Sequence, residues 1–575
     1  MKQIANSLSK QLMIDESILA SWLEIPPNSE MGDLALPCFR LAKELHKSPQ
    51  VIAADIADAL VENELVESAV PAGPYVNFRL NRATAMEQVM RQIRDDDAFY
   101  HGAQGAGQVV AIDLSSPNIA KPFSMGHLRS TVIGTAIANL LESDSYQTLR
   151  INHLGDWGTQ FGKIIVAYHR YGDEAKIKAN PIQELNALYV QFHEAAQDDP
   201  SLDDEARAAF KRMEDGNEDD LRLWRWMIEV SLEEFAKTYA MLGTSFTHNL
   251  GESFYNDKMD AVVKEIQSLG LLVESDGAEV VMLEDVGLPP CLIKRSDGAT
   301  LYATRDLAAA LYRHKDLCAD RLLYVVGGEQ RLHFEQVFAV LTRMGYDFAK
   351  NCKHIAFGMM RLGGKKMSTR KGQVVRLQEV LEEAVGRAKE IINEKNPSLQ
   401  NADLVAKEIG VGAVIFNDLK TNRLHDIDFS METALAFEGE TGPYVQYTHA
   451  RSCSVLRKAY LLDAGVSPEQ LVTHSQAIAQ VDSQTVSLDD PTWELIKQLS
   501  LFPGLRNRAI DEYDPSLIAK HVLDICQAFN HFYHDCPILT ADEPIRSIRL
   551  ALTDAARLTI RNSLQLLGIG YPAEI

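Results

Sequence analysis

Two short stretches of this 575-residue chain carry residue types that can hold phosphate groups. The first is SSPNIAKPFSMGHLRS (115–130), in which Lys121 and His127 lie only six residues apart. Lysine ammonium and imidazole N–H groups can stabilise the negative charge that develops on phosphoryl oxygens in a transition state. The second stretch runs from Lys350 to Arg376 and contains no acidic residue. Chemistry on a phosphate is therefore the first prediction from this sequence.

The residues around His127 predict a strand, a loop and a helix, in that order. Residues 109–114 are apolar or β-branched for the most part, which is typical of a buried parallel strand. Pro117 and Pro122 end this strand, because proline lacks an N–H and disfavours helical geometry in the residue before it. Apolar residues at helical spacing follow Gly126, so a helix begins close to His127. A helix N-terminus at the carboxyl end of a parallel strand favours a bound phosphate.

The loop before this helix lacks the glycines of a Walker A loop and of a G-x-G-x-x-G turn. A side chain, here His127, would therefore contact the phosphates. On position alone the alternative is a histidine that only caps its helix and is otherwise solvated. Residues 148–152 predict a second parallel strand, and the HLGDWGTQFG loop after it is expected at the same edge of the sheet.

A further pair of side chains suits a guanidinium group. Tyr302 and Asp306 lie four residues apart in an alanine-rich segment that predicts a helix over 302–313, so they share one helix face. A planar guanidinium donates to a carboxylate and a phenol in fixed directions, whereas an ammonium would fill fewer of these positions. The alternative is a surface aspartate that caps its own helix. The next predicted strand ends in a glycine-rich turn that carries Gln330 and then His333.

The second stretch, HIAFGMMRLGGKKMSTRKGQVV, is basic in a chain whose net charge is -23. A polyanion site explains it better than a basic, solvent-exposed loop does. Its glycines at 363, 364 and 372 would allow it to close over a triphosphate. The basic residues in and around it are Lys350, Lys353, Arg361, Lys365, Lys366, Arg370, Lys371 and Arg376.

Composition excludes several classes of protein. With 46% hydrophobic and 24% charged residues, the chain is typical of a soluble globular protein of several domains. The net charge argues against a general nucleic-acid coat, although RNA could still bind to a local basic face. No apolar run of about 18 residues and no signal peptide is found, so no membrane association is expected. The seven cysteines form no C-x-x-C pair, which disfavours a zinc ribbon and fits a reducing cytosol.

The string SPNIAKPFSMGHLRS resembles the first signature of class I aminoacyl-tRNA synthetases and, in its long form, that of the arginyl-tRNA synthetases. KMSTR resembles the second class I signature. The catalytic residues that this resemblance implies are Lys121, His127, Lys366 and Lys371. The implied ATP-binding residues are Ser124, Gly126, His127, Met367 and Ser368. The implied arginine-binding residues are Ser116, Asn118, Tyr302, Asp306 and Gln330.

Two positions depart from the usual signatures. Ser124 stands where the first histidine of H-x-G-H is usual, and Thr369 stands where the second lysine of the other signature is usual. Arginyl-tRNA synthetases commonly show the second change, and Lys121 is expected to supply part of the missing charge. The resemblance also implies that Asn77 and Phe78 contact tRNA, with the Phe78 ring free to stack on an unpaired base.

The expected fold class is α/β: a catalytic core with a Rossmann-type parallel sheet, an N-terminal α+β domain and a C-terminal all-α domain. The resemblance implies that the N-terminal domain, 1–105, contacts tRNA. The predicted catalytic domain, 106–375, contains a helical insertion at about 173–260. A helical stem follows over 376–440, and a helical anticodon-binding domain over 441–575.

The implied activity is ATP-dependent ligation of L-arginine to its cognate tRNA through arginyl-adenylate, with release of AMP and pyrophosphate. The implied partners are tRNA(Arg), L-arginine and ATP with Mg²⁺. No protein-bound metal is expected, and the chain is expected to be a cytoplasmic monomer. In this family adenylate formation needs bound tRNA. Two alternatives stay open: a class I synthetase for another amino acid, and a tRNA-binding or regulatory protein whose catalytic site has decayed at Ser124 and Thr369.

Overall fold

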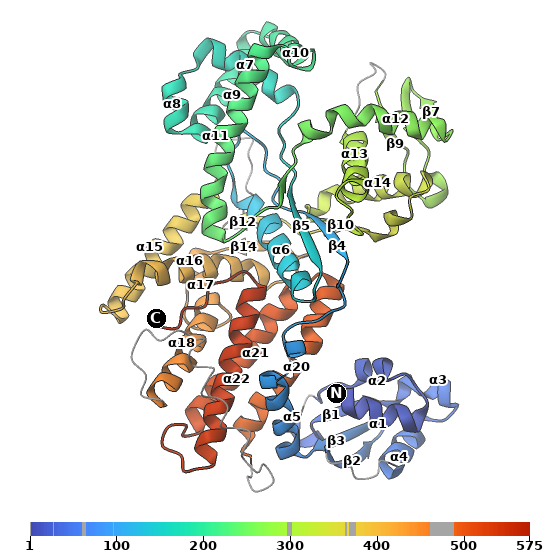
Figure 1. The fold of residues 1–575 in the computed structure, drawn as a ribbon, viewed down its shortest axis with the longest axis vertical. Coiled ribbons are helices and arrows are strands. Elements are labelled where there is room, and N and C mark those ends of the chain that lie inside the picture. Colours follow the sequence, from blue (N-terminus) through green and yellow to red (C-terminus); the bar gives the residue numbers. More distant parts are fainter. Residues whose placement is uncertain are drawn as a thin grey trace. The chain divides into compact units, whose positions relative to one another are not determined.

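The structure is a computed structural model, and it divides the chain into two compact units (Figure 1). The first unit comprises Met1–Phe99, Val455–Leu501 and Gln527–Ala556, and the second comprises Tyr100–Ser454, Phe502–Cys526 and Arg557–Ile575. The residues that the structure describes are 2–26, 28–59, 65–95, 97–295, 302–362, 365–366, 375–459 and 488–575.

The second unit is built around a five-stranded sheet in which all neighbouring strands are parallel. Its strand order is β11-β10-β4-β5-β6, so chain order runs outward in opposite directions from β4. The point between β4 and β10 is therefore a topological switch point, where ligands bind beyond the carboxyl ends of the strands. This sheet confirms the predicted Rossmann-type core. The strands are β4 (Val109–Asp113), β5 (Gln147–Asn152), β6 (His248–Asn249), β10 (Arg321–Tyr324) and β11 (Cys352–His354).

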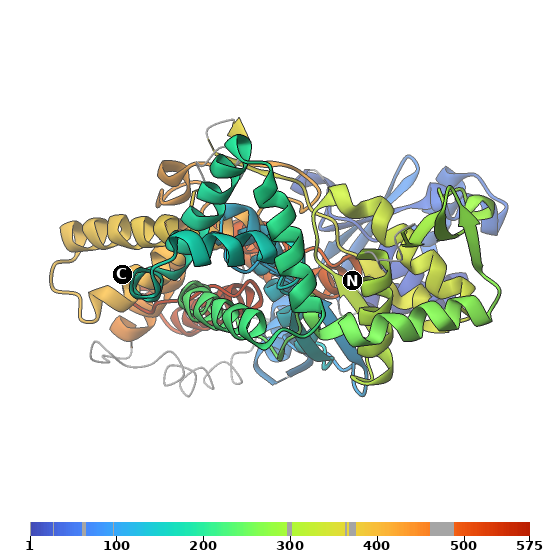
Figure 2. The same ribbon diagram turned by 90° about the horizontal axis from the view of Figure 1, so that it is seen from above.

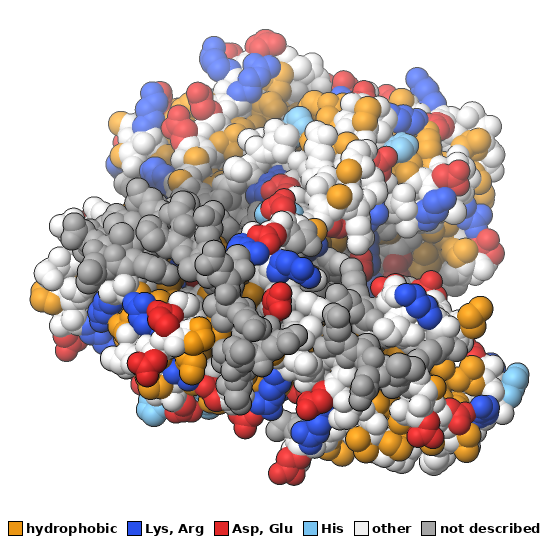
Figure 3. All heavy atoms as spheres, turned by 60° about the horizontal axis from the view of Figure 1, so that its bottom comes forward, with side chains coloured by type: hydrophobic (Ala, Val, Ile, Leu, Met, Phe, Trp, Pro, Cys, Tyr) orange, Lys and Arg blue, Asp and Glu red, His pale blue; other side chains and the backbone are white. Residues whose placement is uncertain are grey.

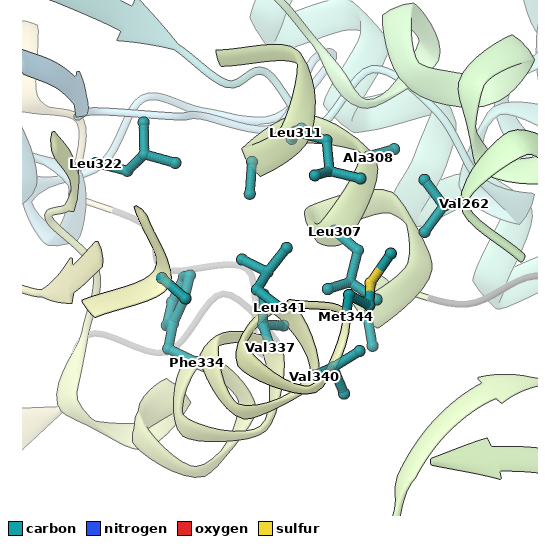
Figure 4. Packing of buried hydrophobic residues seen from close by; sticks show 14 of the residues in the cluster. Val262, Leu307, Ala308, Leu311, Leu322, Phe334, Val337, Val340, Leu341 and Met344 are labelled. Carbon is teal, nitrogen blue, oxygen red and sulfur yellow. The ribbon is translucent and has the colours of Figure 1, made fainter. Parts of the chain in front are cut away.

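Helices follow these strands in the manner of βαβ units. Helix α6 (Met125–Glu142) follows β4 and begins two residues before His127, as predicted. Helix α7 (Thr159–Tyr171) follows β5. Helix α13 (Tyr302–Lys315) precedes β10 and confirms the predicted helix, and α14 (Arg331–Arg343) connects β10 to β11. The two helices share one buried apolar cluster, to which α13 contributes Leu307 and Leu311 and α14 contributes Val337 and Leu341 (Figure 4). This packing fixes α13 against α14 and so positions any ligand-binding side chain on either helix.

Four helices form most of the predicted insertion and lie together in Figures 1 and 2. They are α8 (Glu174–Ala179), α9 (Pro181–Asp198), α10 (Ser201–Glu214) and α11 (Glu218–Leu242). Helix α11 ends at Gly243, which adopts a left-handed φ of 68°. The chain then returns to the sheet as β6, so the helical run is shorter than the predicted 173–260 range. A two-residue strand carries too little pattern to be seen in the sequence.

The segment between β6 and α13 forms η4 (Glu252–Lys258), α12 (Met259–Ser268) and a small antiparallel sheet. The strands of this sheet are β7 (Leu272–Ser275), β8 (Ala278–Val281) and β9 (Cys291–Lys294). Strand β9 pairs with β8 and so belongs to this small sheet and not to the parallel one.

A third small sheet follows β11 in the chain, with β12 (Met360–Leu362) between β13 (Lys365–Lys366) and β14 (Ile427–Phe429). Helices dominate the region beyond it, as predicted: α15 (Leu377–Lys395), α16 (Ala402–Leu419), α17 (Met431–Ala434) and α18 (Gly442–Ala459). The long helices α20 (Asp490–Glu512), α21 (Ser516–Asp535) and α22 (Ile545–Leu566) confirm the helical C-terminal region.

The first unit contains a three-stranded antiparallel sheet of order β1-β3-β2 and the helices beside it. Within Met1–Phe99 the main helices and strands of this unit are α1 (Lys2–Leu12), α2 (Glu16–Trp22), β1 (Leu34–Pro37), α3 (Ala42–Leu45), α4 (Pro49–Ala59), β2 (Val66–Ala72), β3 (Tyr75–Leu80) and α5 (Arg82–Asp95). Ile52 and Ile56 are buried on one face of α4, as their spacing predicts, and Leu60 lies outside the described residues.

The predicted stacking role of Phe78 is wrong in this structure. Phe78 lies in the central strand β3 and is 0% exposed, within the apolar cluster of the N-terminal domain. A ring that is enclosed on all sides cannot stack on a base. Asn77 is 8% exposed and so offers little surface for contact with tRNA.

None of the described helices is long and apolar enough to cross a bilayer. On the face drawn in Figure 3, the described Lys and Arg side chains lie interspersed with Asp and Glu side chains. The net negative charge of the chain therefore does not form one continuous acidic patch on that face.

Candidate active site

Three loops follow the carboxyl ends of β4, β5 and β10 and converge at one edge of the parallel sheet. The first two are joined directly. Ile119 N–H donates to the Gly155 carbonyl and Gly155 N–H donates to the Pro117 carbonyl, both at 3.1 Å. Gly155 is required here, because a β-carbon at this position would lie 2.1 Å from the Asn118 side chain. The predicted loops therefore form one wall of a switch-point crevice.

The loop after β4 contains three non-glycine residues with left-handed backbone geometry: Ser115 (φ 68°), Ser116 (φ 53°) and Ala120 (φ 60°). Such residues are uncommon and cost free energy unless neighbouring contacts hold them. Here Ser116 Oγ donates to Asp113 Oδ1 at 2.7 Å, and Ser115 Oγ lies 2.8 Å from the Tyr239 hydroxyl. These contacts fix the loop without the glycines that a Walker A loop would use.

His127 occupies the third position of α6 and reaches back to the start of the helix. The N–H of Ser124, the N-cap residue, donates to His127 Nδ1 at 3.1 Å, in the manner of a capping box. Burial lowers the pKa of the His127 imidazole to about 4, so the ring is neutral near pH 7. Because Nδ1 accepts a hydrogen bond, the ring proton resides on Nε2 and remains available as a donor. His127 therefore caps the helix and can still donate to a phosphate oxygen.

Lys121 lies earlier in the same loop and is partly buried. Burial lowers the pKa of its ammonium group, and the charge of Glu252 only partly offsets this effect. Its Nζ lies 5.7 Å from the ring centre of Tyr189, on α9. Within the part of the chain that the structure describes, no carboxylate forms an ion pair with Lys121. Its charge is thus available for an anionic ligand.

The predicted guanidinium-binding side chains lie on and near α13. Tyr302 is 68% exposed at the start of the helix, and Asp306 lies one turn later, where His333 Nε2 of α14 is 2.5 Å from its Oδ2. Burial raises the pKa of the Asp306 carboxyl, but the hydrogen bond from His333 and the nearby positive groups lower it overall. The carboxyl is therefore ionised near pH 7. Gln330 is exposed at the end of the short helix η6 (Gly328–Gln330), directly before α14.

A buried ion pair connects this helix to the first loop. Arg313 of α13 donates to Asp113 Oδ2 at 2.8 Å, and both side chains are almost fully buried. The other oxygen of Asp113 accepts from Ser116, so one carboxylate links α13, β4 and the Ser116 turn. Sequence reasoning missed this pair, because an arginine 200 residues away from its aspartate carries no local signal.

The two signature stretches also meet. At the C-terminal end of the second stretch, the Val375 carbonyl accepts from Met125 N–H at 3.2 Å, and Leu377 N–H, just beyond it, donates to the Phe123 carbonyl at 2.9 Å. In the N-terminal part of the stretch, the Gly358 carbonyl accepts from the Arg129 guanidinium at 2.8 Å. The start of α6 therefore holds both ends of the second stretch. Within that stretch the predicted residues Met367, Ser368 and Lys371 and the Lys366 side chain lie outside the described residues.

Arg129 is a second residue that sequence reasoning missed. It is 1% exposed, lies 3.2 Å from Asp418 of α16, and also donates to the His425 carbonyl at 2.8 Å. Burial raises the pKa of the Asp418 carboxyl to about 6, although Arg129 opposes this shift. An arginine within the apolar run that follows His127 was the available signal, since an isolated buried charge is costly.

Glu252 is the third missed residue. It lies in η4, and its side chain is 3.5 Å from Arg305 of α13. Burial raises the pKa of its carboxyl to about 7, and the negative charges of Asp156 and Asp306 add to this effect. The residues that the structure describes contain no group of three or more His, Cys, Asp or Glu side chains able to hold a metal ion.

Family models account for nearly the whole chain. The model described as "tRNA synthetases class I (R), catalytic domain" matches residues 89–431. The "Arginyl tRNA synthetase N terminal domain" matches 1–80, and the "DALR anticodon binding domain" matches 445–575. The chain belongs to the class I arginyl-tRNA synthetases. The family that the two signatures predict is therefore confirmed, together with the fold class.

Curated relatives of this arginyl-tRNA synthetase family are similar over their full length. The arginine–tRNA ligase of Lactococcus lactis subsp. lactis (strain IL1403) is 50% identical over 558 residues, which cover 96% of this chain and 95% of the relative. That of Alkaliphilus metalliredigens (strain QYMF) is 47% identical over 563 residues, with 98% and 97% covered. Because both relatives are arginine–tRNA ligases, these matches favour arginine over another amino acid as the substrate.

Solved structures of arginyl-tRNA synthetases share the fold. The Thermus thermophilus arginyl-tRNA synthetase is 28% identical with a TM-score of 0.81, and 96% of each chain is covered. The Plasmodium falciparum arginyl-tRNA synthetase is 23% identical with a TM-score of 0.78, covering 100% of this chain and 98% of that one. The parallel sheet and the helical C-terminal region are thus shared across distant members.

Proposed function

We propose that this chain attaches L-arginine to tRNA(Arg) at the switch-point crevice, in two steps. In the first step the arginine carboxylate attacks the α-phosphorus of ATP, which forms arginyl-adenylate and releases pyrophosphate. In the second step a terminal ribose hydroxyl of the tRNA takes the arginyl group, and AMP leaves. No side chain becomes a covalent nucleophile, so catalysis is positioning and stabilisation of phosphoryl charge.

One observation carries this proposal. The start of α6 binds both ends of the second signature stretch, at the edge of the sheet where the loop after β4 is linked through Asp113 and Arg313 to α13. A phosphate-binding stretch and a guanidinium-binding helix are therefore built onto one strand, β4. Ligation of arginine requires the two substrates to lie side by side in this way.

We assign arginine to one part of the crevice, here called the arginine half. Asp306 receives the guanidinium through Oδ1, for which the described residues provide no hydrogen-bond donor, with Tyr302 beside it on the same helix face. Ser116, Asn118 and Gln330 lie in the loops after β4 and β10, where the α-amino and carboxylate groups of arginine would lie. An ionised Asp306 matches a ligand that carries a permanent positive charge.

We assign the ATP phosphates to the other part, here called the phosphate half. His127 donates from Nε2, Lys121 supplies a positive charge, and Ser124 and Gly126 form the helix start that faces the anion. The second stretch adds Lys366, Met367, Ser368 and Lys371. Mg²⁺ arrives as part of the ATP substrate, held by its phosphates, because imidazole and ammonium groups are not the oxygen ligands that Mg²⁺ prefers.

The remaining predictions complete the proposal. The domain of residues 1–105 contacts the tRNA, and the domain of residues 441–575 binds the anticodon, with 106–375 as the catalytic domain and 376–440 as the stem. The match of the N-terminal family model supports the first contact, which no longer rests on Phe78. The chain acts as a cytoplasmic monomer.

The direct test is formation of arginyl-tRNA by the purified chain with ATP, Mg²⁺ and tRNA(Arg). A panel of the other amino acids serves as the control for specificity. Among the amino acids of the panel, only arginine is expected to be attached to the tRNA. Loading of another amino acid would refute the assignment of the arginine half, and absence of any charged tRNA would support the alternative of a decayed catalytic site.

A further inference from the structure

The carboxylate assigned to the arginine guanidinium already has a partner within the chain. His333 Nε2 lies 2.5 Å from Asp306 Oδ2, and the contact joins α14 to α13. The two side chains are 25% and 22% exposed, so the pair is partly open to solvent and is not enclosed in the apolar core. The apolar cluster beneath the pair fixes the two helices against each other, so that the contact is held in register.

The chemistry of this contact depends on one proton. A carboxylate only accepts, so the hydrogen must reside on His333 Nε2. While Nδ1 is unprotonated, the ring is neutral, and Asp306 keeps its full negative charge and an Oδ1 that no described residue contacts. A second proton on Nδ1 turns the ring into a cation at the same carboxylate. That cation and the guanidinium of arginine would then compete for one negative charge.

We propose that His333 is a positioning residue that couples arginine binding to its own protonation: the neutral ring orients Asp306 for the guanidinium, and the protonated ring opposes arginine. This inference rests on the proposed function, because it requires arginine to bind at Asp306. It gives His333 a role that neither signature stretch contains. Arginine binding should therefore weaken as the pH falls, and it should expel a proton from the chain.

The other ionisable groups around the pair decide how this effect can be recognised. They are Asp113 of β4, His153 and Asp156 of the loop after β5, Glu252 of η4, Arg305 and Arg313 of α13, Tyr324 of β10, and His354 of β11 beyond the Phe334 ring.

Most of these groups keep one charge state between about pH 6 and 8. Burial lowers the pKa of His153 and of His354, so both rings stay neutral. Burial lowers the pKa of Arg313, but the charge of Asp113 and its other neighbours outweighs this, so Arg313 stays ionised, and burial raises the pKa of Tyr324. Glu252 differs, since burial raises its pKa to about 7, and its protonation would also weaken the binding of a cation. The test must therefore separate His333 from Glu252.

The experiment is titration calorimetry of L-arginine into the full chain between about pH 5.5 and 8.5, in buffers of different ionisation enthalpy. For the wild type, the dissociation constant is expected to rise by up to about tenfold per pH unit on the acid side, with net release of one proton on binding. In His333→Gln an amide N–H can still orient Asp306 but cannot take a charge. Its dissociation constant is expected to depend on pH much less, with fewer protons released on binding than in the wild type.

Two variants serve as matched controls. His314→Gln changes a histidine of α13 whose Nδ1 contacts the Ala319 carbonyl at 2.9 Å and whose ring stacks on Phe348, and it should keep the wild-type pH dependence. Glu252→Gln should lose only the part of the pH dependence that Glu252 contributes and keep the part that His333 contributes. If His333→Gln does not fold, as judged by its unfolding transition, His333→Asn replaces it.

The results distinguish a failure of the inference about His333 from a failure of the proposed function. A pH-independent affinity in the wild type overturns the inference. So does a pH dependence that survives in His333→Gln and disappears in Glu252→Gln. Absence of arginine binding at every pH would instead refute the proposed function, because the coupling requires a bound arginine.

Discussion

The two halves of the crevice differ in whether their ligand-binding groups already have a partner within the chain. In the arginine half both carboxylates already have a donor: Asp306 contacts His333, and Asp113 accepts from Arg313. In the phosphate half the donors are uncharged or unpaired. His127 is neutral because burial lowers its pKa to about 4, and Lys121 has a lowered pKa and no ion-pair partner among the described residues.

The difference follows from what each ligand brings. Arginine brings one positive charge, so its half must hold a carboxylate ionised before the ligand arrives, and neighbouring donors do this for Asp306. ATP brings several negative charges, which raise the affinity of a partly buried lysine for its proton once they are bound. The positive charge of Lys121 therefore gains a partner only when the phosphates bind. In the arginine half the ligand-binding carboxylate has a partner before arginine binds, whereas in the phosphate half Lys121 meets its partner charge only when the phosphates bind.

The largest expected effect concerns stability. Arg313→Met leaves Asp113 buried without its partner and should lower the free energy of unfolding by about 3 to 5 kcal/mol. Lys121→Met in the phosphate half breaks no ion pair and should cost about 1 kcal/mol or less. Urea unfolding of the two variants measures the difference. Equal losses of stability would remove the distinction between the halves.

His127→Ala should lower the rate of arginine activation by about 10²- to 10³-fold, because it removes a donor aimed at developing phosphoryl charge. It should also cost about 1 kcal/mol of stability, since Ser124 N–H loses its acceptor. His127→Gln is the matched control, because glutamine at this helix position can close the same capping box. We expect the glutamine variant to recover the stability and not the rate. Recovery of both would reduce His127 to a capping residue.

Asp306→Asn should raise the KM for arginine by about 30- to 1,000-fold, which corresponds to a loss of about 2 to 4 kcal/mol. The guanidinium would lose its counter-charge, and the His333 N–H would lose a charged acceptor. Steady-state aminoacylation with varied arginine measures this effect. An equal rise in the KM for ATP would place Asp306 outside the arginine half.

A smaller effect distinguishes the lysines of the phosphate half. Lys121→Ala should slow activation more than Lys366→Ala or Lys371→Ala, by about tenfold. Lys366 and Lys371 are close in the sequence and can partly replace each other, whereas Lys121 lies in a loop that Ser231 Oγ and the Gly155 backbone fix on either side. Pyrophosphate exchange by the three variants gives the ranking. A Lys121→Ala enzyme faster than either of the others would reverse the proposed division of charge.

The strand, the loop and the helix around His127 were predictable because proline and β-branched residues act locally. The left-handed geometry of Ser115, Ser116 and Ala120 was not, since it is imposed by distant partners such as Tyr239. The same limit applies to the pairing of Asp306 with His333, which depends on how two helices pack.

Phe78 shows that the sequence of a strand does not indicate which of its faces is buried. An aromatic residue in a short strand can face either water or core, and the choice depends on which strand becomes central in the sheet. The resemblance correctly indicated the domain that contains Phe78 but could not indicate the direction of its ring.

The most direct test of the two halves is arginine-dependent ATP–pyrophosphate exchange, with tRNA present, for the wild type, Asp306→Asn and Lys121→Ala. Both KM values and the maximal rate are measured for each enzyme. The account predicts a crossed pattern: Asp306→Asn weakens arginine by at least about 30-fold with little change for ATP, and Lys121→Ala impairs the ATP-dependent parameters with little change in the KM for arginine. If each variant weakened both substrates equally, the division of the crevice into an arginine half and a phosphate half would be wrong.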